Sequence, residues 1–185
     1  MLIQYKLLVV IRRLLIIIVS VSITYAWLSW SGVVNISDTS ECFDVNYVKG
    51  QDIGSDSNPA SFSLASTYTE GLSSVIKVNL KDTCTISNGT GTLYLNTDST
   101  TSSILLTSNV LKYQVLDGTN EVASGIVSST GNLPIYNNIE INNQVKQLTV
   151  YIWIDGSLVN NDNSNDILSS VYKENISMSI ESGDK

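Results

Sequence analysis

Apolar and polar residues alternate along most of the chain beyond residue 42, which is the period of a β-strand with two different faces. In residues 75–80, for example, three aliphatic side chains fall on one face while Lys77 and Asn79 fall on the other. Eight stretches of this kind are predicted to be strands: residues 42–48, 75–84, 91–96, 111–116, 122–128, 135–141, 147–154 and 175–180.

Glycine-containing dipeptides lie between these stretches and predict tight turns. They are Asn88-Gly89, Asp117-Gly118, Gly131-Asn132 and Asp155-Gly156. Short strands at this spacing predict an all-β fold, an antiparallel β-sandwich of jelly-roll or Greek-key type. One stretch, residues 147–154, is apolar on both faces, with Ile152 and Ile154 opposite Tyr151 and Trp153, so we expect it to be a central strand covered on both sides.

Two segments without strand periodicity, residues 50–70 and 155–170, are expected to be long loops, and Pro59 interrupts the first of them. The second contains four oxygen-bearing side chains that could bind Ca²⁺, namely Asp162, Asn163, Asn165 and Asp166. Their spacing differs from an EF-hand loop, and Asn and Asp are ordinary turn residues. We therefore expect turns here and predict no metal site.

A long apolar run occupies residues 14–34, preceded by Arg12 and Arg13 and free of charged residues. As a helix it would extend roughly 30 Å, the thickness of the bilayer core. It predicts one N-terminal hydrophobic helix, with membrane contacts at the residues Leu14, Ile18, Trp27 and Trp30.

The same run also has features of a cleaved signal peptide. Residues 14–23 would form its apolar region, and Thr24, Tyr25 and Ala26 would form a small-residue site with cleavage at Ala26. The run is long for a signal peptide, so both alternatives remain open at this point. Residues 1–13 are expected to be a basic cytoplasmic N-terminus, residues 14–34 the anchor or signal, and residues 35–185 an extracellular domain.

Charge separates the two ends of the chain. Three basic residues precede the apolar run, whereas all 17 Asp and Glu follow it with seven Lys, a net charge of −10. The positive-inside rule therefore predicts export of the acidic part, to the outer face of the cell membrane or to the cell surface after cleavage. An acidic domain without a basic patch argues against nucleic acid as a partner.

Both cysteines, Cys42 and Cys84, lie in the part expected to be exported, where a disulfide can persist. A disulfide between them is one interpretation, and two separately buried thiols are the other.

The chain has no His, which removes the usual base of Ser and Cys nucleophiles and a common zinc ligand. It has no phosphate-binding glycine loop either. Ser–Lys or paired carboxylates remain formally available, but nothing in their spacing singles them out. We predict no enzyme, no catalytic residue and no cofactor.

The segment TYAWLSW, residues 24–30, followed by a Ser-, Thr- and Asn-rich β domain, resembles exported camelysin- and TasA-like proteins of Gram-positive bacteria. That resemblance implies a jelly-roll-like sandwich, cleavage near Ala26, and surface or biofilm-matrix fibres. In such fibres an N-terminal strand, here residues 27–37, would complete the sheet of the next subunit. The protease activity associated with camelysin is not carried over, because this chain has neither His nor an HExxH motif.

The expected function is accordingly a non-enzymatic surface or fibre-forming protein, with the membrane and further copies of itself as partners. Two alternatives remain. One is a module that binds a surface glycan or protein through exposed Tyr and Trp. The other is a minor pilin-like subunit, although the first acidic residue, Asp38, lies far from the N-terminus for that class.

Overall fold

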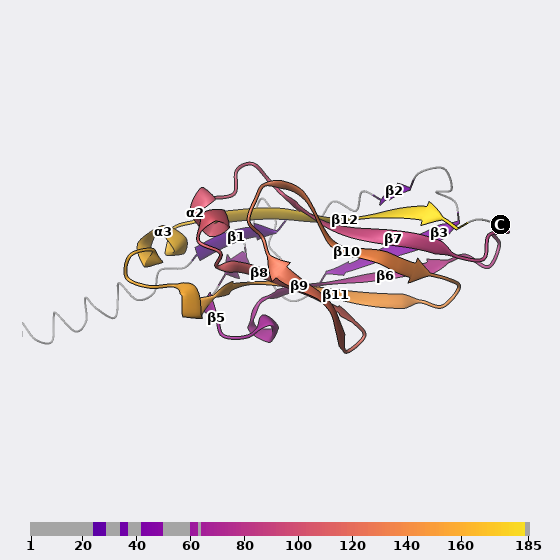
Figure 1. Ribbon diagram of the computed structural model, residues 1–185, viewed down its shortest axis with the longest axis horizontal. Coiled ribbons are helices and arrows are strands. Elements are labelled where there is room, and N and C mark those ends of the chain that lie inside the picture. Colours follow the sequence, from indigo (N-terminus) through magenta and orange to yellow (C-terminus); the bar gives the residue numbers. More distant parts are fainter. Residues whose placement is uncertain (1–23, 29–33, 37–41, 50–59, 63, 184–185) are drawn as a thin grey trace, which may run out of the picture.

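The computed structural model describes residues 24–28, 34–36, 42–49, 60–62 and 64–183. Within them the chain forms two β-sheets and a few short helices (Figure 1). The prediction of an all-β, sandwich-like fold is confirmed.

Sheet A has the strand order β10-β7-β12-β1-β4, with β2 also beside β12. Its strands are β1 (Thr24–Leu28), β2 (Val34–Ile36), β4 (Ala60–Phe62), β7 (Gly89–Thr97), β10 (Gly131–Ile141) and β12 (Val171–Ser182). β12 is antiparallel to β7, whereas β1 and β2 run parallel to β12.

Sheet B has the order β3-β6-β11-β8-β9, with β5 beside β11. Its strands are β3 (Phe43–Lys49), β5 (Leu64–Ala65), β6 (Leu72–Leu80), β8 (Leu111–Asp117), β9 (Asn120–Ile126) and β11 (Lys146–Asp155). β11 is bonded to β6 on one side and β8 on the other, so the predicted central strand is confirmed as central.

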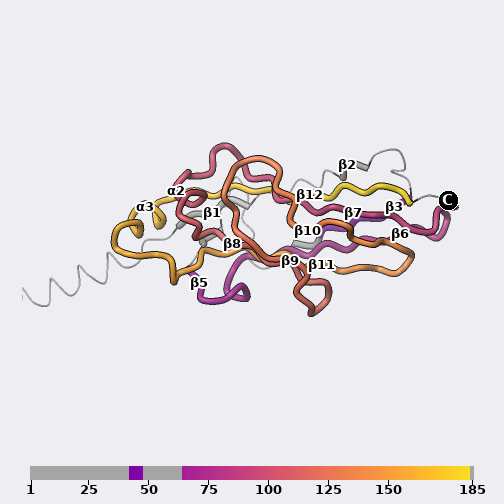
Figure 2. The backbone as a smooth tube through the Cα atoms, in the orientation of Figure 1, coloured from indigo at the N-terminus to yellow at the C-terminus, as the bar shows by residue number. Residues whose placement is uncertain are grey.

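The two sheets share one hydrophobic core, which period-two alternation builds from both sides. Along β12, every second residue from Tyr172 to Ile180 is buried, and along β11 the same holds from Leu148 to Ile154. In Figure 2, β12 and β11 both run along the length of the molecule, with β12 above β11 in this view. Alternation of apolar and polar residues therefore predicts these strands well, because each strand has one face in the core.

All eight predicted strands are present, with shifted ends. β6 starts at Leu72 and stops at Leu80, so the predicted extension to Cys84 is wrong. Gly118 forms the predicted β8–β9 turn with φ of 61°. Gly131, in contrast, is the first residue of β10, and its φ of 94° begins the strand.

The two predicted loops contain more structure than the sequence pattern suggested. The first holds β4, β5 and the 3-10 helix η1 (Tyr68–Glu70), while Pro59 lies outside the described residues. The second holds η2 (Gly156–Leu158) and α3 (Ser164–Leu168). A further helix, α2 (Ser103–Thr107), was not expected. These elements are too short to show a period, and distant strands supply the partners of β4 and β5.

Candidate functional site

The N-terminal strand β1 lies between β12 and β4. Tyr25 to Leu28 pair in parallel with Val171 to Glu174, and Thr24 to Ala26 pair with β4 on the other side. Further along, β2 pairs with Met178 to Ile180, in a register two residues out of step with that of β1. Residues 24–28, within the apolar run, and 34–36, at its end, are therefore part of the sheet.

The predicted helix of residues 14–34 lies mostly outside the described residues, and those of its residues that are described are not helical. Thr24–Leu28 and Val34 lie in strands, because their backbone groups pair with β12 and β4. Ala26 and Trp27 belong to β1, while Leu14, Ile18 and Trp30 lie outside the described residues. Among the described helices, none is both long and apolar enough to cross a bilayer.

The Cys42–Cys84 disulfide is present, with the two Cα atoms 5.6 Å apart. Cys42 precedes β3 and Cys84 follows β6, so the bond joins two antiparallel neighbours at one end of sheet B. The backbone adds a link at the same place, since Lys81 N donates to Cys42 O over 2.8 Å. The disulfide thus fastens β3, an edge strand of sheet B, to the sheet.

A buried carboxyl lies directly beside β1. Glu174 is 1% exposed, and its Oε2 accepts hydrogen bonds from the Tyr172 hydroxyl and, over 3.0 Å, from the Thr97 hydroxyl. Burial raises the pKa of Glu174 to about 8, although both hydrogen bonds act to lower it. Its Oε1 has no hydrogen-bond partner among the described residues. Glu174 is therefore mostly a neutral acid at pH 7.

A cavity of about 490 Å³ borders this cluster. Its walls come from the ends of β7 and β10 and from β12, with Asp98 and Lys173 as charged members. The Thr100 side chain and backbone hydrogen bonds hold the pKa of Asp98 below its ordinary value. Polar groups around the cavity already form hydrogen bonds with the protein. Asn96 Nδ2, for instance, donates to Asn175 O and Ser177 Oγ.

An aromatic cluster lies on the outer face of sheet B. The Tyr68 ring of η1 meets the Tyr151 ring edge-on at 4.9 Å and the Trp153 ring at 6.5 Å, and all three are half-buried. Gly71 permits this approach, since a Cβ there would lie 2.5 Å from Ile152 O. η1 thus covers part of β11, and the rings keep some exposed surface.

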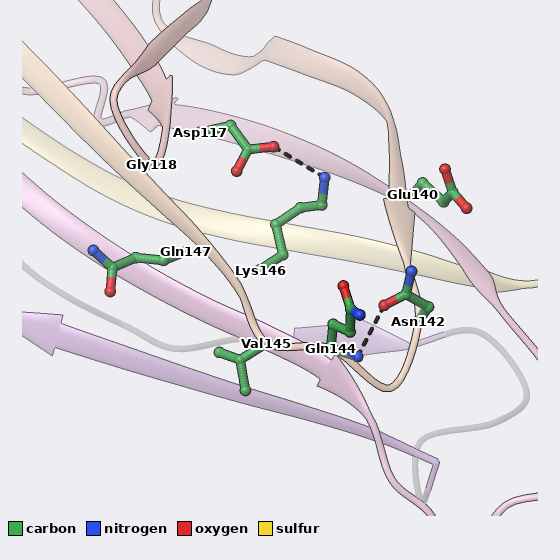
Figure 3. Close-up of a pocket in the computed structure, with 8 residues that line it drawn as sticks. All are labelled: Asp117, Gly118, Glu140, Asn142, Gln144, Val145, Lys146 and Gln147. Atoms are coloured by element: carbon green, nitrogen blue, oxygen red, sulfur yellow. Dashed lines mark hydrogen bonds and ion pairs between the residues drawn. The ribbon is translucent and has the colours of Figure 1, made fainter.

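A polar pocket of about 380 Å³ lies between the β8–β9 turn and the connection from β10 in sheet A to β11 in sheet B (Figure 3). Lys146 Nζ reaches toward Asp117 Oδ2 at 3.0 Å. Gln144 N donates to Asn142 Oδ1 over 2.9 Å. The pocket presents amide and charged side chains, which suit the binding of a polar group.

The segment considered for Ca²⁺ uses its side chains as turn caps. Asn163 Oδ1 accepts from Asn160 N over 2.8 Å, and Asn160 Oδ1 accepts from Asp162 N over 2.9 Å. Among the described residues, no group of three or more His, Cys, Asp or Glu is placed to hold a metal ion.

Sequence reasoning missed Glu174, Tyr172 and Tyr68 as members of clusters. A Glu at an inward position of a strand pattern was the available signal for Glu174. No short-range signal existed for Tyr68, because its partners on β11 lie about 80 residues away in a segment with which η1 does not pair.

Fold and site together define a class: an all-β protein with two packed sheets, one internal disulfide and a short N-terminal strand in parallel with the last strand. Comparison with protein-family models, curated proteins and solved structures found no match.

Proposed function

We propose that this chain is an exported cell-surface protein that assembles into fibres by strand addition. The observation that carries the proposal is the place of β1 and β2 in sheet A. They fill one side of β12 in two short parallel pieces out of step with each other, an arrangement held by fewer regular bonds than a continuous antiparallel strand. The same side of β12 could accept the N-terminal segment of another copy.

The sheet orders support a jelly roll. β10-β7-β12-β1 faces β6-β11-β8-β9, which is the order expected for two interleaved Greek keys of four strands each. One feature departs from that pattern. In a jelly roll the first strand runs antiparallel to the last, whereas here β1 runs parallel to β12. A strand from a neighbouring copy could pair with β12 in either direction, because no connection within the same chain would fix its direction.

Export follows from the N-terminal apolar run and the acidic domain beyond it. Because strand β1 starts at Thr24, the apolar run available as a helix is residues 14–23, about ten residues or roughly 15 Å. That length is half of the bilayer core and lies within the range of a signal-peptide apolar region. It favours cleavage at Ala26 over a retained anchor.

The proposal is tested on the protein exported by a Gram-positive host. Mass spectrometry of its N-terminus should give Trp27, and electron microscopy should show fibres. A product that stays monomeric at all concentrations and salt conditions would contradict the fibre function.

A second candidate function, glycan binding, rests on the aromatic cluster. Partly exposed Tyr and Trp rings flanked by an ion pair suit the apolar and hydroxyl faces of a sugar. The ion pair is Lys112 with Asp155 at 2.5 Å, and Lys112 is the cross-strand neighbour of Trp153.

A glycan array tests this candidate. Trp153→Ala should weaken any binding about tenfold, whereas Tyr94→Ala, on the outer face of sheet A, should leave it unchanged. Equal binding by both variants and the unaltered chain would exclude the aromatic cluster as the site.

A further inference from the structure

The predicted cleavage site lies inside a paired strand. Cleavage after Ala26 would remove Thr24, Tyr25 and Ala26 from β1 and leave only Trp27 and Leu28 of it.

On one side, β4 depends wholly on the residues that cleavage removes. Its three residues, Ala60 to Phe62, pair with Ala26, Tyr25 and Thr24 in turn. Among the described strands, β4 pairs with no other.

On the other side, the start of β12 loses its sheet partner. The pairing of β12 with β7 begins at Glu174, so Val171 and Tyr172 have β1 as their sheet neighbour. Their opposite side is already occupied by the loop at residues 98–102, where Ser102 N donates to Val171 O and Asp98 N to Lys173 O. The open side is therefore the one that β1 occupies. The Tyr172 side chain itself is fully buried.

We propose that residues 24–26 cap the sheet in the uncleaved chain, and that cleavage after Ala26 opens an acceptor edge between β12 and β4 for a second copy of this chain. Export and assembly are thereby coupled: the precursor is self-paired, and the processed chain exposes unpaired N–H and C=O groups on two strands. This inference rests on the proposed strand-addition function and adds the event that controls it.

The test compares the unaltered chain with Ala26→Val, both expressed in full and purified in detergent. Val is favourable in a strand but too large for the small-residue site, so it should block cleavage while preserving β1. Leu28→Val is the matched control, because the change lies in the same strand and leaves all three residues of the cleavage site, 24–26, unaltered.

Hydrogen exchange of the amides at residues 60–62 and at Tyr172 is the first readout. Val171 is left out because its N–H donates to Ser102 Oγ on the other side of β12. In the processed chain and in processed Leu28→Val, monomers should exchange these amides at least tenfold faster than uncleaved Ala26→Val, with exchange in β6 and β11 unchanged. Equal protection in cleaved and uncleaved chains would overturn the inference, and so would a processed N-terminus elsewhere than Trp27.

Sedimentation is the second readout. The processed chains should assemble and Ala26→Val should remain monomeric; assembly of Ala26→Val at the same rate would overturn the inference. If no form assembles while the amides still lose protection on cleavage, the fibre function fails and the uncapping of the edge is upheld.

Discussion

Glu174 places a titrating group in the core, between Tyr172 and Thr97. Its pKa of about 8 lies above the ordinary value of 4.5, so the folded protein holds a proton that the unfolded chain releases. The contribution to stability is fully present below pH 4.5 and is lost as the pH rises through 8. A salt-bridged carboxylate behaves in the opposite way, because its pKa is lowered and its contribution to stability is lost as the pH falls.

The first prediction is that Glu174→Gln removes this pH dependence. For the unaltered chain, the free energy of unfolding should fall between pH 5 and 8, by an amount on the order of 4 kcal/mol. The Gln variant should be nearly flat, because its amide carbonyl still accepts both hydroxyls and cannot ionise. Urea titrations at a series of pH values measure this, with the exposed Glu140→Gln as control; a falling curve for Glu174→Gln would contradict the assignment.

Among the elements, η1 and β3 each depend on one local feature besides their ordinary contacts. η1 packs on β11 because Gly71 has no Cβ, and the Trp153 Cβ would lie 2.7 Å from one. The disulfide fastens β3 to the end of β6.

The second prediction concerns Gly71→Ala. The added methyl meets backbone, so η1 must move away from β11, at a cost of about 1–3 kcal/mol in unfolding free energy. Trp fluorescence should shift as Trp153 becomes more exposed. Gly156→Ala, whose nearest neighbour is the Leu64 side chain at 3.3 Å, should cost clearly less, and equal losses would argue against the close contact at Gly71.

The third prediction is that Cys42→Ser with Cys84→Ser lowers the free energy of unfolding by up to about 4 kcal/mol, because the bond closes a loop of 42 residues in the unfolded chain. Denaturant titration measures it, with the chemically reduced unaltered chain as comparison. Exchange should rise most in β3. An unchanged denaturation midpoint in both the double variant and the reduced chain would mean that the disulfide contributes little to stability.

At the scale of the whole molecule, charge opposes assembly. The part of the chain beyond residue 34 carries seven Lys and 17 acidic residues, so neighbouring copies repel each other.

The fourth prediction is therefore that fibre growth speeds up with salt. Between about 10 mM and 150 mM NaCl the screening length shortens from roughly 30 Å to 8 Å, which weakens repulsion between copies. Light scattering of the processed chain at increasing NaCl measures growth, with sucrose of equal osmolality as control. Growth that slows with salt would indicate that attraction between charges drives assembly.

The sequence by itself determined eight of the strands, the sandwich and the core faces, because alternation in residues such as Leu148 to Ile154 depends only on which face is buried. For the two cysteines it left two interpretations, a disulfide or two separately buried thiols. Tertiary structure alone decided that Thr24–Leu28 is a strand, that Cys42 meets Cys84, and that Tyr68 reaches β11. Each of these depends on partners far away in the chain. An apolar segment such as residues 24–28 suits a bilayer and a sheet equally well, and only the open side of β12 makes the choice.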